Sequence, residues 1–191
     1  MKRLWSIKSV VTMGLFCALS VILGTVLSIK VIPLTGVYTL NVSLNLLPVH
    51  LAGLCFGPVA GFMVGFLADL IKWAVNPMGA YHPGFGFSMG MIGFTTALIA
   101  QIVRRRQVRL AFDPETEWLD GLTWLTVLPG VAAAQILFSV ILNSYWIASM
   151  SGVDMRALLP TRIVNAAMMI PVYGVLIREC VLIIRRFVAK V

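Results

Sequence analysis

Residues 43–75 read SLNLLPVHLAGLCFGPVAGFMVGFLADLIKWAV, and this stretch decides the class of fold. It holds two apolar segments, 43–56 and 58–75, which are divided only by the helix breakers Gly57 and Pro58. Segments this apolar need a cover of lipid, where a helix satisfies its own backbone hydrogen bonds. The first segment is short for a membrane span, so we expect a tilted or partly re-entrant helix that turns directly into the second.

The rest of the chain has the same character. Of its 191 residues, 60% are hydrophobic and 12% are charged, which exceeds the apolar content that a soluble domain of this length buries. A spanning helix needs roughly 20 apolar residues, so the chain has room for about six spans and no separate soluble domain. We therefore expect an all-α integral membrane protein, a bundle of six transmembrane helices that forms one domain over residues 1–191. The spans are expected at about 7–30, 43–56, 58–75, 84–103, 122–149 and 158–184.

Basic residues predict the orientation in the membrane. Most of the 15 Lys and Arg fall into three groups that an even number of crossings brings to one side. The positive-inside rule assigns this side, with both termini, to the cytoplasm of a bacterial cell. The net charge of +8 therefore reflects topology, and we expect no nucleic-acid partner. The groups are Lys2, Arg3 and Lys8; Arg104, Arg105, Arg106 and Arg109; and Arg178, Arg185, Arg186 and Lys190.

Three connecting segments lie on the opposite, outer face and are rich in Pro, Gly, Asn, Tyr and Thr. This composition is typical of ordered turns that carry hydrogen-bonding groups, whereas a plain connector between spans can be shorter. The sequence therefore predicts a binding site at this face. The segments are 33–41, 76–83 and 151–157, and the remaining basic residues, Lys30, Lys72, Arg156 and Arg162, lie at or near the span ends beside them.

Aromatic clusters also mark this face. Residues 76–85 read NPMGAYHPGF, in which two prolines and two glycines fix an irregular turn around Tyr81 and His82. Such a turn presents an aromatic face and an imidazole that suit stacking on a flat heteroaromatic ligand. A second cluster, NSYW at 143–146, ends the fifth span on the same side. Both clusters also fit an aromatic belt at the membrane surface, so that alternative stays open.

Charged side chains at the ends of spans form a further set of candidates. Asp69 and Lys72 are three residues apart in the third span, so they share a helix face that should not point at lipid. They either contact a ligand or merely neutralise each other. Arg162 begins the last span, where its guanidinium group either holds a carboxylate or phosphate or extends to the lipid headgroups, as we expect for Arg156.

The sequence contains no P-loop and no HExxH pattern. We therefore expect a binding or transport subunit rather than an enzyme, with no metal site and no cofactor in this chain. Small residues four apart in the first span, Gly14 and Ala18, let another helix approach closely, either within the chain or from a partner subunit. A self-sufficient small-molecule transporter and a membrane-embedded assembly factor or enzyme stay open as alternatives.

A series of motifs resembles one family. The motifs are LAGLCFGPVAG at 51–61, ADL at 68–70, PMGAYHPGF at 77–85, NSYW at 143–146, LLPTRI at 158–163 and IP at 170–171. In this order they resemble the folate-type S components, the substrate-binding subunits of energy-coupling factor (ECF) vitamin transporters. The resemblance implies a six-helix bundle that captures a B-group vitamin at its outer face. It also implies a transmembrane T component and two cytoplasmic ATPase subunits as partners, and these partners bind the ATP.

The resemblance also assigns individual residues. Gly14 and Ala18 match the first-helix AxxxA motif that contacts the T component, with Gly in place of the first Ala. His82, Gly86 and Asn165 stand where the family more often has Phe, Thr and Lys. Because that Lys is missing, a smaller heteroaromatic compound such as hydroxymethylpyrimidine or pyridoxine stands beside folate as the expected ligand. The expected substrate-binding residues are Lys30, Asn41, Asp69, Lys72, Tyr81, His82, Phe85, Asn143, Trp146, Arg162 and Asn165.

Overall fold

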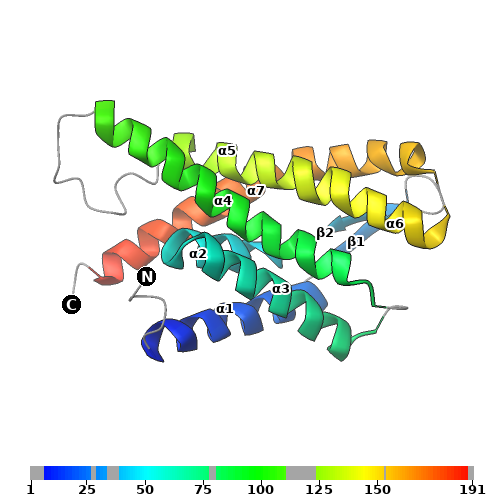
Figure 1. The fold of residues 1–191 in the computed structure, drawn as a ribbon, viewed down its shortest axis with the longest axis horizontal. Coiled ribbons are helices and arrows are strands. Elements are labelled where there is room, and N and C mark those ends of the chain that lie inside the picture. Colours follow the sequence, from blue (N-terminus) through cyan, green and yellow to red (C-terminus); the bar gives the residue numbers. More distant parts are fainter. Residues whose placement is uncertain are drawn as a thin grey trace.

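The computed structural model describes residues 7–26, 29–33, 39–77, 81–110, 124–152 and 154–188. Within these ranges the chain forms an elongated helical bundle, as the sequence predicted (Figure 1). The π-helix η1 continues α5 and leads directly into α6, so the three form one long helical stretch. The helices are α1 (Ile7–Thr25), α2 (Leu46–Phe56), α3 (Pro58–Val75), α4 (Pro83–Leu110), α5 (Trp124–Ala134), η1 (Gln135–Leu142), α6 (Asn143–Ser151) and α7 (Met155–Val188).

The bundle contains the expected six helical stretches. Five of them, within the described residues, are long and apolar enough to cross a membrane. The sixth is α2, whose 11 residues extend about 16 Å and therefore do not cover a hydrocarbon core of about 30 Å. The all-α membrane architecture is confirmed, and α2 is the short helix that the sequence predicted.

The segment after α1 differs from the expectation. We expected the first span to continue to about residue 30, but α1 ends at Thr25. Two short strands follow, β1 (Ile29–Pro33) and β2 (Thr39–Val42), and they pair in an antiparallel hairpin with Lys30 opposite Asn41. The first strand is rich in β-branched residues, which favour extended backbone over helix. The apolar run of the sequence therefore ends in a hairpin rather than in a longer helix.

α7 begins earlier than expected, at Met155 instead of residue 158. The carboxylate of Asp154 accepts a hydrogen bond from the backbone N–H of Arg156 at 2.9 Å. The backbone carbonyl oxygen of Asp154 accepts a second one from the backbone N–H of Ala157 at 3.0 Å. These bonds satisfy N–H groups that have no partner within the helix. Arg156 therefore lies in the first turn of α7, with its side chain exposed.

The turn between α2 and α3 consists of one residue, as the sequence predicted. Gly57 has φ +103°, a conformation that side chains with a Cβ disfavour, and its N–H donates to the Gly53 carbonyl at 2.8 Å. Pro58 follows at the first position of α3, where a missing N–H costs no hydrogen bond. α2 therefore reverses directly into α3.

α2 lies at the centre of the bundle, and residues 48–54 are all buried. Its Leu51 and Leu54 belong to a core cluster with residues of α4, α5 and α7. Its Val49 and Ala52 belong to a second cluster with residues of α1, α3 and α4. A helix buried on all sides needs no lipid contact, which explains why α2 is shorter than a membrane span.

α2 also carries a fully buried histidine. His50 Nδ1 lies 2.9 Å from the Thr96 hydroxyl of α4, and this hydroxyl in turn lies 2.9 Å from the Ile92 carbonyl oxygen. The imidazole packs edge-on against Tyr173 of α7, with 5.4 Å between ring centroids. One polar side chain thus connects three helices at the centre of the core.

Glycines let α2, α3 and α4 approach to backbone contact. A Cβ added at Gly61 of α3 would lie 2.8 Å from the Gly53 Cα of α2 and 2.8 Å from the Gly93 carbonyl oxygen of α4. A Cβ added at Gly93 would lie 2.6 Å from the Gly61 carbonyl oxygen. Helices in lipid associate through such close van der Waals packing.

The two ends of the bundle differ in what they hold. Figure 1 shows the start of α1 and the end of α7 at one end, together with the end of α4 and the start of α5. The opposite end holds the end of α3, the start of α4, all of α6 and the start of α7. This second end is the one that carries the predicted site residues.

The glycine packing generates a stability prediction. Gly93→Ala is expected to lower the free energy of unfolding by about 1–3 kcal/mol, because the added methyl group overpacks against the backbone of α3. Denaturant titration in detergent, followed by circular dichroism, measures this difference. Gly14→Ala is the matched control, since in the described part of the chain no atom beyond the neighbouring backbone of α1 lies within 4 Å of a Cβ added there. An equal loss in both variants would contradict the packing.

Candidate functional site

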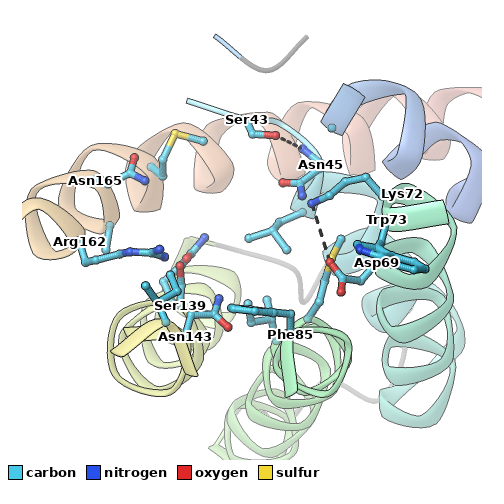
Figure 2. A pocket seen from close by; sticks show the side chains of 18 of the residues that line it. Ser43, Asn45, Asp69, Lys72, Trp73, Phe85, Ser139, Asn143, Arg162 and Asn165 are labelled. Atoms are coloured by element: carbon cyan, nitrogen blue, oxygen red, sulfur yellow. Dashed lines mark hydrogen bonds and ion pairs between the residues drawn. The ribbon is translucent and has the colours of Figure 1, made fainter. Parts of the chain in front are cut away.

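A cavity of about 710 Å³ is lined by residues toward the end of the bundle that lies opposite the start of α1. Figure 2 shows this cavity from close by. Residues of α1, α2, α3, α4, η1, α6 and α7 line it, together with Ser43, Asn45, Asn76, Tyr81 and His82 of the connecting segments. This volume lies within the roughly 300–1,000 Å³ that is typical of small-molecule sites. The arrangement predicts a site for a vitamin-sized ligand.

One wall of the cavity, on α3, carries an ion pair. Lys72 Nζ lies 3.8 Å from Asp69 Oδ1, and the side chain of Asp69 is only 14% exposed. The Lys72 stem passes α1, since a Cβ added at Gly24 would lie 3.1 Å from Lys72 Cδ. The two residues pair with each other, as one of the two readings expected, and they also line the cavity. Their contact with a ligand stays a prediction.

The facing wall, on α7, carries the cation Arg162. Figure 2 shows its guanidinium group extending into the cavity from the side opposite Asp69. Arg162 is half-buried and forms no ion pair with the residues that the structure describes. Asn165, one turn further along α7, lines the same wall. A half-buried guanidinium group of this kind is suited to a carboxylate, which it can bind through two hydrogen bonds.

Aromatic rings form much of the remaining surface. The rings of Trp73 and Tyr81 lie 5.1 Å apart, and His82 lies 4.8 Å from Trp146 and 6.0 Å from Phe85. These spacings are those of stacked and edge-on aromatic pairs. The cavity therefore offers flat apolar faces beside its charged groups.

The turn before α4 holds His82 in place. Its Nδ1 accepts a hydrogen bond from the Gly84 N–H at 3.1 Å, so a neutral ring carries its proton on Nε2. A Cβ added at Gly84 would lie 2.5 Å from Trp146 Cε2 and 2.7 Å from His82 Nδ1. Glycine at this position therefore allows the indole and the imidazole to meet.

Three buried polar atoms around the cavity have no hydrogen-bond partner among the described residues. They are the Tyr81 hydroxyl, Asn143 Oδ1 and Trp146 Nε1. An unsatisfied buried polar group costs about 1–3 kcal/mol, so these atoms lower the stability of the structure around the cavity. Burial, followed by the nearby carboxylate of Asp69, raises the pKa of the Tyr81 hydroxyl above its usual value. This hydroxyl is therefore a neutral donor.

The π-helix η1 provides polar groups that the sequence analysis missed. Gln135 and Ser139 of η1 line the cavity, and so does Asn143, whose N–H bonds to the Phe138 carbonyl five residues back. Wider π turns shift the residues that follow around the helix axis, and they often occur at functional sites. The signal that could have found these residues is the spacing of Gln135 and Ser139, two polar residues four apart within an apolar span.

Other lining residues were also not anticipated. Ser43 and Asn45 follow the hairpin, and the Tyr173 hydroxyl donates to the Ser43 carbonyl oxygen. The Ser20 hydroxyl of α1 donates to the Asn45 carbonyl oxygen at 2.6 Å. These bonds attach the segment after β2 to both α1 and α7. Trp73, which the aromatic analysis passed over, completes the wall on α3.

Most of the predicted binding residues line the cavity, although their role in binding stays a prediction. The ring of Trp146 lies 4.8 Å from the ring of His82, but Trp146 is not among the lining residues. Lys30 and Asn41 face each other in the hairpin register, and their side chains lie outside the described part of the chain. The residues that line the cavity are Asp69, Lys72, Tyr81, His82, Phe85, Asn143, Arg162 and Asn165.

The predicted partner residues lie elsewhere. Gly14 and Ala18 are exposed on α1, and no atom of the described structure lies within 4 Å of a Cβ added at Gly14. Exposed apolar side chains surround them, including Val11, Leu15 and Ile22. Among the residues that the structure describes, no helix packs on this face of α1 at Gly14, so the alternative of an internal partner helix is not supported there.

Comparison with known proteins gives several relatives. A folate transporter FolT of Clostridium novyi (strain NT) is 25% identical over 140 residues, which are 72% of this chain and 70% of that protein. A UPF0397 protein of Clostridium perfringens (strain SM101 / Type A) is 26% identical over 157 residues, 79% of this chain and 81% of that protein.

Two solved structures share the fold. The crystal structure of FolT bound with folic acid matches with a TM-score of 0.68 and 21% identity, over 90% of this chain and 91% of that one. The structure of an S component of a bacterial ECF transporter matches with a TM-score of 0.52 and 21% identity, over 96% of each chain. The six-helix membrane fold is therefore that of an S component.

The family assignment follows from a match along nearly the whole chain. The family model described as "ECF-type riboflavin transporter, S component" matches residues 4–179. It confirms the resemblance drawn from the motifs and identifies a subunit of a transporter rather than an enzyme. With its apolar helices, the chain is a multi-pass protein of the bacterial cell membrane. The chain belongs to the family of ECF-type riboflavin transporter S components.

Proposed function

We propose that this protein captures folate at the outer face of the membrane and delivers it through a T component and two ATPase subunits that bind ATP. The observation that carries the proposal is a cavity that combines aromatic walls with a cationic Arg162 at one side. The relative from Clostridium novyi, whose name is folate transporter, supports the same ligand. Delivery through the partner subunits rests on the family.

Folate fits the chemistry of the cavity. It contains a fused heteroaromatic ring, which suits the rings of Trp73, Tyr81 and Phe85. Its glutamate tail carries carboxylates, which suit Arg162. A cavity of about 710 Å³ is large for hydroxymethylpyrimidine or pyridoxine, each of which has one small ring. Riboflavin, which the family description names, has no carboxylate for Arg162 to bind.

A titration of the purified full-length chain in detergent tests the ligand. We expect folate to bind more tightly than riboflavin, hydroxymethylpyrimidine or pyridoxine by isothermal calorimetry. Arg162→Gln is expected to weaken folate binding by roughly tenfold or more, because it removes a charged hydrogen-bond donor. Arg156→Gln is the matched control, since Arg156 is exposed and lies outside the cavity. Riboflavin binding above folate binding would reject the proposed ligand.

The orientation follows from the charge pattern. The ends of α4 and α7 and the start of α1 share one end of the bundle. The basic residues that the structure describes in these segments are Lys8 of α1, Arg104, Arg105, Arg106 and Arg109 of α4, and Arg178, Arg185 and Arg186 of α7. The positive-inside rule assigns that end to the cytoplasm. The cavity at the opposite end then opens to the outside of the cell.

Thiol labelling tests this orientation. In a background without Cys17, Cys55 and Cys180, a membrane-impermeant thiosulfonate added to intact cells is expected to modify Ser139→Cys, because the cavity admits water. Ile136→Cys on the same helix is the control and should stay unmodified, because its exposed side chain faces lipid, where a thiol does not ionise. Modification of Ser139→Cys only after the cells are opened would show that the cavity opens to the cytoplasm and that the proposed orientation is wrong.

The exposed face of α1 is the proposed contact for the T component. Gly14 and Ala18 lie four residues apart, and their small side chains let a partner helix approach closely. The open space around Gly14 leaves room for that helix. This face is separate from the cavity, so partner binding and ligand binding can be changed independently.

Copurification tests the partner surface. Gly14→Leu is expected to reduce the amount of T component and ATPases recovered with the tagged chain, because the bulky side chain holds the partner helix away. Folate affinity should not change, since Gly14 does not line the cavity. Ala167→Leu, which adds similar bulk at an exposed position of α7, serves as the control. Full recovery with Gly14→Leu would exclude this face.

A further inference from the structure

The segment that joins the hairpin to α2, residues 43–45, is neither helix nor strand, although it lies against the cavity. Ser43 and Asn45 both line the cavity. In a membrane protein, irregular backbone is tolerated only where protein or water satisfies its polar groups. The Leu44 carbonyl oxygen accepts a hydrogen bond from the Leu47 N–H at 3.1 Å. The carbonyl oxygens at the two ends of the segment need partners from elsewhere in the fold.

Two buried hydroxyl groups provide these partners. The Ser20 hydroxyl of α1 donates to the Asn45 carbonyl oxygen at 2.6 Å, and the Tyr173 hydroxyl of α7 donates to the Ser43 carbonyl oxygen. Ser20 is 1% exposed and Tyr173 is 2% exposed. The three-residue segment is therefore held at both of its ends, and a different helix holds each end.

The two hydroxyl-bearing residues differ in their relation to the cavity. Tyr173 lines the cavity and can touch a ligand, whereas Ser20 is not among the lining residues. Ser20 can therefore affect a ligand only through the segment that it holds. A change at Ser20 tests the effect of that segment without a contribution from direct contact.

The end of α1 also determines what lies beside Asn45. A Cβ added at Gly24, one turn after Ser20, would lie 3.2 Å from Asn45 Cβ and 3.1 Å from Lys72 Cδ. Glycine at this position therefore lets both side chains pass over α1 to the cavity, which both of them line. Figure 2 shows Asn45 beside Lys72 at this edge of the cavity. A shift of Asn45 would consequently disturb the wall on α3.

We propose that Ser20 and Tyr173 are positioning residues for ligand binding, because their hydroxyl groups hold residues 43–45 in the conformation that completes the cavity. The inference rests on the proposed function, in which this cavity binds folate. A site whose wall is fixed before binding loses less conformational entropy when the ligand binds. Without either hydroxyl group a buried carbonyl oxygen stays unsatisfied, so the segment moves toward water and affinity falls.

Calorimetric titration of the purified full-length chain with folate tests the proposal. Ser20→Ala and Tyr173→Phe are each expected to weaken folate binding about five- to tenfold, since each removes one hydrogen bond to the segment. Because both bonds hold the same three residues, the double variant should be weakened by less than the product of the two single effects.

Ser88→Ala is the matched control and should keep wild-type affinity. Its hydroxyl is fully buried and donates to the Gly84 carbonyl oxygen at 2.8 Å, but it does not line the cavity. The fitted number of sites reports how much of each variant is folded, and the dissociation constant describes that folded fraction. A partly unfolded variant therefore still gives a result.

A pair of variants with similar bulk separates the hydroxyl group of Ser20 from the shape of its side chain. Ser20→Thr keeps the hydroxyl, and Ser20→Val replaces it with a methyl group of similar size. Ser20→Thr is expected to bind folate about five- to tenfold more tightly than Ser20→Val, because only Thr can donate to the Asn45 carbonyl oxygen. Equal affinities of the two variants would overturn the proposal.

Amide hydrogen exchange in the ligand-free chain gives a readout that does not depend on the ligand. Exchange in residues 43–47 should be faster in Ser20→Ala than in the wild-type chain, and unchanged in Ser88→Ala. Wild-type folate affinity in Ser20→Ala overturns the positioning role and leaves folate capture intact. A wild-type chain that binds no folate overturns the proposed function. Unchanged exchange in Ser20→Ala would then reject the hold on residues 43–45 as well, whereas faster exchange would retain it.

Discussion

Backbone contact between α2, α3 and α4 is the constraint on which the rest of the structure depends. Lipid provides no hydrophobic force between helices, so their association relies on close packing. Gly53, Gly61 and Gly93 remove the side chains that would hold these helices apart. Because α3 lies directly against α4, the end of α3 and the start of α4 form one continuous wall. Asp69 and Phe85 therefore face the same cavity.

The sequence predicts those parts of the fold that depend on local chemistry. α3 begins at Pro58 and ends at Val75, as expected, because proline and the polar Asn76 mark its limits. The hairpin was missed, since an apolar run rich in β-branched residues fits the end of a helix as well as a strand. The π-helix was missed because no local composition distinguishes it from an α-helix.

The residues of the cavity likewise divide into those that local chemistry predicts and those that it does not. Asp69 and Arg162 were predicted because a charge in an apolar span is costly unless it faces an interior. Gln135 and Ser139 are uncharged, so their cost in an apolar span is smaller and their signal weaker. Tyr173 and His50 could not be assigned from the sequence, because their partners, Ser43 and Thr96, lie in distant segments. Long-range hydrogen bonds of this kind depend on the tertiary fold.

The two charged walls of the cavity differ in whether their charge is already paired. Lys72 balances the negative charge of Asp69 while the cavity is empty, which limits the cost of keeping that carboxylate away from water. Arg162 has no such partner among the described residues, so an anion gains most by binding there.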